Sequence, residues 1–139
     1  MESTFRMLGG GSGLTSDKIT VNDREIDVIA TSQGVIWFEF DAICRTRRSS
    51  HDYIEIARQY HTVMLSEIPQ MTDRDNDAAR RFIELVDEMY DRNVNLIVSS
   101  DFPAHKLYTG KRLEEPFQRT ASRLVEMSSE SYLGKPHLG

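Results

Sequence analysis

The sequence predicts an α/β fold, a parallel sheet with flanking helices that is preceded by a small antiparallel β segment. Residues 18–40 alternate apolar and polar side chains between short turn signals, which is the pattern of half-buried antiparallel strands. Residues 61–108 instead place a long amphipathic segment between two short apolar runs, which indicates a strand, a helix and a second strand. We expect this βαβ unit to have a right-handed crossover.

Three short antiparallel strands are expected in the β segment, separated by Asn22-Asp23 and Ser32-Gln33-Gly34 turns. The third strand should lead into the sheet of the following α/β unit, with Trp37 and Phe38 in the core. In order, the expected strands cover residues 19–21, 26–30 and 35–40.

Three helices and two buried strands complete the prediction. Ser49 or Ser50 is a suitable N-cap for the first helix, and Asp52 is favourable in its first turn because it lies near the positive end of the helix dipole. Pro116 is tolerated in the first turn of the last helix, where its missing N–H needs no intrahelical partner. The expected helices cover residues 51–60, 76–92 and 114–127, and the strands cover 63–65 and 94–98.

The length of 139 residues predicts one modest core. Residues 1–17, with glycines between 9 and 13, are expected to be a flexible lead-in. Residues 18–133 are expected to form a single α/β domain, rich in strands over 18–40 and α/β in character over 41–133. Residues 134–139 are expected to be a tail.

Composition narrows the classes of function. A formal net charge of -5 disfavours a general nucleic-acid binder, which needs a basic surface. The lone Cys44 has no partner for an internal disulfide and favours a reducing compartment. No apolar run approaches the roughly 20 residues that span a bilayer, and the N-terminus is unlike a signal peptide. A cytoplasmic protein is therefore expected.

Polar residues follow the two buried strands of the 61–108 unit, at the edge where α/β proteins place their ligands. Glu67 follows the first strand, and Ser99-Ser100-Asp101 follows the second. This order matches the second half of a P-loop nucleotidase core, in which a carboxylate handles metal and water and a polar strand end senses the γ-phosphate. Ser66 stands where that core has its metal-holding Asp, and a hydroxyl is a weaker ligand for a hard cation. A solvated loop acid at Glu67, and turns and caps at 99–101, are the alternatives.

The phosphate-cradling loop of such a core has the pattern Gly, any four residues, then Gly-Lys-Ser/Thr. That pattern does not occur in these 139 residues. Gly110-Lys111 is followed by Arg112, and Gly134-Lys135 is followed by Pro136. The predicted scaffold therefore lacks the residues that would hold the phosphates.

Several arginines could bind an anion or an acidic partner. Arg112 and Arg119 flank the start of the last helix and could reach a phosphate, although salt bridges or solvent exposure are alternatives. Arg45, Arg47 and Arg48 precede a helix N-terminus and are candidates for partner binding, with an internally neutralised surface as the alternative. The four histidines have no zinc-ligand spacing, so no metal site is expected.

A set of joined motifs resembles the C-terminal half of the ZapE and Afg-type, AAA-like cell-division ATPases. The resemblance covers roughly residue 18 to the end. Its motifs are FEFDAIC at 38–44, RSSHDYI at 48–54, YHTVMLSEIP at 60–69, ARRFIELVDEMYD at 79–91, FQRT at 117–120, SRL at 122–124 and EMSSESYL at 126–133.

The resemblance implies a parent family that binds and hydrolyses ATP with Mg²⁺, acts in the cytoplasm and engages the division protein FtsZ. In that family the phosphate loop and the acidic metal-binding motif lie in the preceding half. We therefore expect this chain to be a module that is not catalytic alone, binds no cofactor alone and has that N-terminal half as its partner. Glu67, Ser100, Asp101, Arg112 and Arg119 remain the candidate catalytic residues.

Two other interpretations stay open. One is a self-contained nucleotide-dependent enzyme with a divergent site at Glu67 and Asp101. The other is a free-standing protein-binding module with no ATPase parent. Neither interpretation changes the expected fold.

Overall fold

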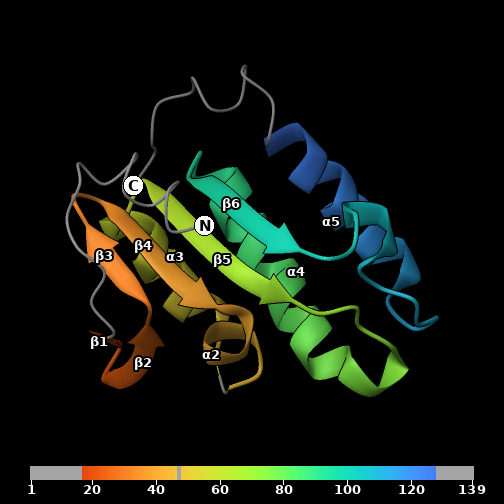
Figure 1. Cartoon of the computed structure of the whole chain (residues 1–139), viewed down its shortest axis with the longest axis horizontal. Coiled ribbons are helices and arrows are strands. Elements are labelled where there is room, and N and C mark those ends of the chain that lie inside the picture. The colour runs from red at the N-terminus through yellow and green to blue at the C-terminus, as the bar shows by residue number, and fades with distance from the viewer. Residues whose placement is uncertain (1–16, 47, 128–139) are drawn as a thin grey trace.

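The computed structural model describes residues 17–46 and 48–127. The expected lead-in and tail fall almost entirely outside these ranges. The described residues form an α/β structure in which helices pack against one face of a four-stranded sheet (Figure 1). The predicted fold class is therefore confirmed.

Residues 17–46 and 48–127 form two sheets. A two-stranded antiparallel sheet pairs β1 with β2, and a four-stranded sheet has the order β3-β4-β5-β6. β3 runs antiparallel to β4, whereas β4, β5 and β6 are parallel. The strands are β1 Asp17–Val21, β2 Arg24–Val28, β3 Ala30–Ser32, β4 Val35–Glu39, β5 Thr62–Ile68 and β6 Asn95–Ser100.

The helices connect the strands in the expected order. Among the described residues, the α-helices are α2 Phe40–Cys44, α3 Ser50–Gln59, α4 Asn76–Asp91 and α5 Glu114–Met127, and the short 3-10 helices are η1 Asp73–Asp75 and η2 Ala104–Lys106. The helix and strand types predicted for residues 49–127 are correct, and α5 has the predicted bounds.

The β segment differs from the prediction in two places. The expected second strand is divided between the two sheets, because the pairing with β1 ends at Val28 and the pairing of β3 with β4 begins at Ala30. Phe40, expected as the last residue of a strand, begins the short helix α2 instead. Phe40 is fully buried, so its apolar character alone does not distinguish a strand end from a helix start.

Aromatic rings join the helices to the core. The Phe82 ring of α4 lies 5.9 Å from that of Phe40 and 5.9 Å from that of Phe117 on α5. The Tyr108 ring stacks on Phe117 at 5.4 Å. α4 therefore contributes the central side chain of a continuous aromatic row, as its long apolar stripe predicts.

A second apolar cluster lies on the other face of the sheet. It contains Ala30, Val35, Trp37 and Met64, all at most 8% exposed. The Trp37 indole Nε1 donates a hydrogen bond to the Ser66 hydroxyl at 3.0 Å. The expected core position of Trp37 is thus confirmed, and Phe38 is fully buried on the helix side.

A buried carboxylate anchors α3 to the antiparallel sheet. Asp52 is 2% exposed, and its Oδ2 accepts a hydrogen bond from the backbone N–H of Ser49 at 3.0 Å within a capping box. Its Oδ1 accepts from the Asn22 side chain at 3.1 Å, and Arg24 lies 3.5 Å from Oδ2. Ser49, rather than Ser50, is the N-cap.

Candidate functional site

The parallel strands β5 and β6 end beside each other, and a hollow of about 460 Å³ lies at their carboxyl ends. The predicted residues Glu67, Ser100 and Asp101 come together there, although Glu67 is more than 30 positions from the other two in sequence. The other lining residues are Ile68, Pro69, Ser99 and Phe102. Glu67 and Asp101 are exposed, so two carboxylates face solvent at this edge.

Glu67 lies inside a strand rather than after one. β5 continues to Ile68, and the pairing register with β6 shifts between Leu65 and Ile68. Glu67 has a φ of 61°, a left-handed conformation that glycine adopts more easily than a side-chain-bearing residue. The irregularity turns the Glu67 carboxylate out of the alternation of the strand and toward the hollow.

Ser66 stands where a metal-holding Asp is expected, and its hydroxyl is engaged in a structural hydrogen bond. Its side chain is 6% exposed and accepts the Trp37 indole N–H. Of the residues described, none lies in a group of three or more His, Cys, Asp or Glu side chains that could hold a metal ion. Ser66 therefore supports the sheet instead of contributing to the hollow.

Ser100 has the local role that its sequence context offers as an alternative. Its hydroxyl donates to the Ile68 carbonyl at 2.6 Å and accepts from the Phe102 backbone N–H at 3.2 Å. These bonds join the ends of β5 and β6 and fix the turn after β6. Both the hydrogen and an acceptor site of this hydroxyl are therefore used within the chain.

Arg112 and Arg119 are exposed, and neither lines the hollow. The backbone N–H of Arg112 donates to Asp73 Oδ1 at 3.2 Å, and the backbone N–H of Lys111 donates to the same atom at 2.9 Å. These two backbone bonds are the main reason that the pKa of Asp73 lies below its usual value. The Tyr108 hydroxyl lies 3.1 Å from the same oxygen, so Asp73 holds the loop that leads into α5.

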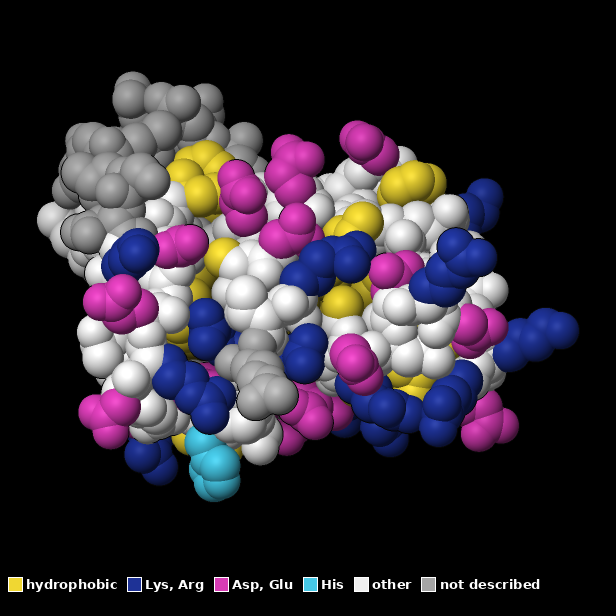
Figure 2. All heavy atoms as spheres, turned by 90° about the horizontal axis from the view of Figure 1, so that it is seen from below, with side chains coloured by type: hydrophobic (Ala, Val, Ile, Leu, Met, Phe, Trp, Pro, Cys, Tyr) yellow, Lys and Arg dark blue, Asp and Glu magenta, His cyan; other side chains and the backbone are white. Residues whose placement is uncertain are grey.

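Two arginines of the basic trio, Arg45 and Arg48, make contacts within the described part of the chain. Arg45 forms ion pairs with Asp41 at 2.9 Å and with Asp75 at 3.3 Å, and its guanidinium lies 5.8 Å from the centre of the Phe40 ring. Arg48 donates to the Glu25 carbonyl at 3.2 Å. Arg47 lies outside the described residues. On the face shown in Figure 2, basic and acidic side chains are interspersed, with no single basic patch.

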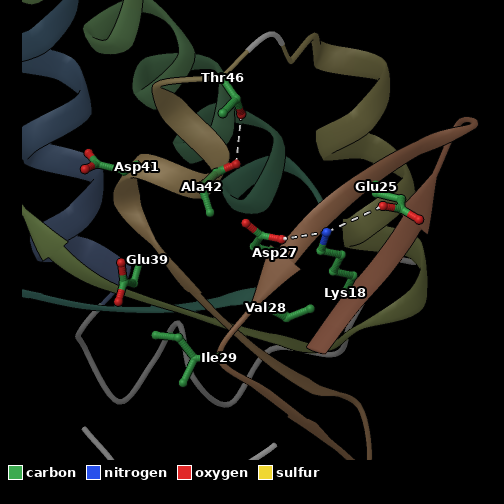
Figure 3. A pocket seen from close by; sticks show the side chains of 9 residues that line it. All are labelled: Lys18, Glu25, Asp27, Val28, Ile29, Glu39, Asp41, Ala42 and Thr46. Carbon is green, nitrogen blue, oxygen red and sulfur yellow. Dashed lines mark hydrogen bonds and ion pairs between the residues drawn. The ribbon is translucent and has the colours of Figure 1, made fainter. Parts of the chain in front are cut away.

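A larger groove lies between the β1–β2 sheet, α2 and the end of β4 (Figure 3). Its volume is about 960 Å³, and Lys18 lies 3.7 Å from Glu25 and 3.9 Å from Asp27 along its wall. The sequence prediction did not include this groove, although the charged alternation of β2 could have indicated it. The lining residues are Lys18, Glu25, Asp27, Val28, Ile29, Glu39, Asp41, Ala42 and Thr46.

Two buried groups have no part in either hollow. Burial raises the pKa of the Cys44 thiol far above its usual value, so the thiol stays protonated and unreactive. Burial likewise raises the pKa of Tyr53, whose hydroxyl donates to the Ile43 carbonyl at 2.9 Å.

No helix among the described residues is long and apolar enough to cross a membrane.

Comparison with known protein families identifies the fold's relatives. The model of a family described as AFG1-like ATPase matches residues 1–136. The chain belongs to the AFG1-like ATPase family. The match includes residues 1–17, so the family resemblance begins earlier than residue 18, where the sequence motifs had placed it.

The curated relatives that this chain matches are longer than the chain. The protein named Cell division protein ZapE of Escherichia coli (strain K12) is 42% identical over 138 residues, which are 99% of this chain and 37% of that protein. A protein of Schizosaccharomyces pombe, named Uncharacterized protein C115.02c, is 31% identical over 86% of this chain and 33% of its own length. Lactation elevated protein 1 homolog B of Danio rerio is 28% identical over 82% of this chain and 29% of its own length.

The chain thus spans about a third of the length of the curated relatives that it matches. No solved structure matches it. The family membership is therefore established for the chain, and the hollow at the ends of β5 and β6 is described for this chain.

Proposed function

We propose that this chain is a module of a ZapE-like cell-division ATPase that does not hydrolyse ATP alone. Its work is to pack on the part of the protein that carries the phosphate loop and to present a surface to a division partner, for which FtsZ is the candidate. ATP and Mg²⁺ are then the cofactors of the whole ATPase, and the cytoplasm is its compartment. In the same proposal, this module forms the C-terminal part of the whole ATPase.

The observation that carries the proposal is that the Ser66 hydroxyl is buried in a hydrogen bond with the Trp37 indole. A site for Mg²⁺-ATP needs oxygen ligands for the metal and backbone N–H groups or a lysine for the phosphates. The Ser66 hydroxyl is buried against the Trp37 indole, and no Gly-x-x-x-x-Gly-Lys-Ser/Thr pattern occurs in the sequence. Glu67 and Asp101 alone would present two carboxylates to a polyanion, which is unfavourable without a metal.

The direct test is titration of the purified chain with a fluorescent ATP analogue in the presence of Mg²⁺. We expect no saturable binding in the micromolar range, with the same result for Glu67→Gln. Micromolar binding by the wild-type chain would overturn the proposal. If Glu67→Gln abolished that binding, the self-contained nucleotide enzyme at Glu67 and Asp101 would be the better account.

A further inference from the structure

The outer edge of β6 has the properties of an edge that accepts another strand. β6 is the last strand in the order of the sheet, and the backbone N–H of Asn95 donates toward β5, to the His61 carbonyl at 2.9 Å. Since residues of a strand alternate in the direction of their backbone groups, Leu96 and Val98 direct theirs away from β5. No strand among the described residues pairs with this side.

This edge also lacks the usual protection against pairing. Natural edge strands commonly carry proline, lysine or an inward charge that blocks the addition of another strand. The sequence of β6, NLIVSS, has no proline and no charged residue. Ile97, Val98, Ser99 and Ser100 are all partly exposed.

The helix layer extends one helix beyond the strand layer. α5 packs on α4, with Phe117 against Phe82 and Arg123 paired with Asp87. In Figure 1, α5 lies past β6 on the side away from β5 and runs opposite to it, as a crossover helix runs relative to its strands. A strand parallel to β6 would therefore lie beneath α5.

Two large apolar side chains, one on α5 and one after β6, are exposed. Val125 is two residues from Arg123, about 200° around the helix, so it faces away from α4. It is 54% exposed, and Phe102, just after β6, is 38% exposed. A small cavity of about 130 Å³ lies between α5 and the η2 region, lined by His105, Tyr108, Glu114, Phe117, Gln118 and Ala121.

We propose that the outer edge of β6 binds one further strand, parallel to β6 and about five residues long, supplied by the part of an AFG1-like ATPase that this chain does not span. The curated relatives, about three times as long, have the extra chain to supply it. Such a strand is apolar on its α5 side, because parallel strands are buried by helices. This inference rests on the proposed function, whose packing interaction it specifies.

A second copy of this chain is a poorer occupant of the edge. Two β6 edges related by a two-fold axis would pair antiparallel. Both copies of α5 would then extend over the same junction, on the same face of the joined sheet. Because α5 extends past β6, the edge favours a partner strand that has no helix of its own over this side of the sheet.

The test measures amide hydrogen exchange in this chain alone and in intact E. coli ZapE, the 42% identical relative. In this chain we expect the Leu96 and Val98 amides to exchange at least about tenfold faster than the Ile97 amide, because of these three amides the alternation directs only that of Ile97 toward β5. In the intact relative we expect the aligned outward amides to be as protected as their neighbours. Equally rapid exchange of those outward amides in the intact relative would overturn the inference.

A matched pair of proline variants tests the same edge in this chain. Val98→Pro removes an outward N–H, whereas Ile97→Pro removes one that bonds to β5, so Ile97→Pro should lower Tm by roughly 5 °C or more beyond Val98→Pro. Equal losses would contradict an open edge. Should both variants fail to fold, the exchange measurement on the wild-type chain decides. Dimerisation that protects Leu96 and Val98 would overturn the assigned occupant.

These outcomes are separate from the ATP titration. Micromolar ATP binding by this chain would refute the proposed function and leave the exchange result readable. Rapid exchange at the edge in the intact relative, together with no ATP binding by this chain, would refute the strand inference alone.

Discussion

Asp52 offers the sharpest test of how the antiparallel sheet is attached to the α/β unit. Replacing it with alanine removes the acceptor for the Ser49 N–H, at 3.0 Å, and for the Asn22 amide, at 3.1 Å. Loss of a capping interaction costs about 1 kcal/mol, and loss of a hydrogen bond to a charged group costs about 1.5–3 kcal/mol. The Arg24 guanidinium lies 3.5 Å from Asp52 Oδ2 and is half-exposed. This ion pair therefore adds at most about a few tenths of a kcal/mol, as other surface ion pairs do.

We therefore expect Asp52→Ala to lower the free energy of unfolding by about 3 kcal/mol. For a domain of this size, such a change lowers Tm by roughly 10 °C. Urea unfolding followed by circular dichroism measures it, with a midpoint shift of about 1–2 M. Asp52→Asn keeps one carbonyl acceptor and should lose about half as much stability.

Glu55→Ala is the matched control, because Glu55 lies on the same helix and its partners, Arg58 and Gln59, are local. It should change stability by no more than about 0.5 kcal/mol. The reasoning would be refuted if Asp52→Ala cost less than about 0.5 kcal/mol, or if Glu55→Ala cost as much as Asp52→Ala.

Three further predictions concern the loop before α5 and the strand ends. A Cβ added at Gly110 would meet the Tyr108 hydroxyl and lie 2.6 Å from Asp73 Oδ1, so Gly110→Ala should cost about 1–3 kcal/mol in thermal unfolding; an unchanged Tm would contradict this contact. Glu67→Gly should raise stability by about 0.5–1 kcal/mol, because glycine adopts the φ of 61° without strain; destabilisation would show that the side chain itself stabilises the fold. The pKa of Asp73 in the folded state lies below its usual value of 3.8. The ionised Asp73 therefore stabilises the fold fully above pH 3.8, and this stabilisation is lost as the pH falls through the lower folded pKa. Asp73→Asn should accordingly reduce the fall in Tm between roughly pH 5 and pH 2, and an unchanged acid dependence would argue against it.

The regular elements were predictable because each has a strong local pattern. The apolar stripe of α4 and the run Glu114–Met127 of α5 have a helical period, and the β5 and β6 runs are short and apolar. The same reasoning placed Glu67 and Asp101 at one edge of a parallel sheet, where the structure brings them together.

The features that the sequence did not reveal depend on contacts between distant residues. Ser66 has the spacing of a metal ligand, and only the fold brings the Trp37 indole, 29 residues away, to its hydroxyl. The left-handed backbone at Glu67 could not be predicted, because glycine is the residue that usually marks such a position. The helix α2 has only five residues, too few for a helical period to appear in the sequence. Tertiary pairing, rather than local propensity, decides these positions.

Phosphate release from Mg²⁺-ATP by the purified chain tests the central claim most directly. If this chain is a structural and docking module of a ZapE-like ATPase, release should equal that of a buffer control and should be unchanged in Glu67→Gln. Turnover that scales with the concentration of the chain and collapses in Glu67→Gln would contradict the claim, and would make the hollow at the ends of β5 and β6 an active site in its own right.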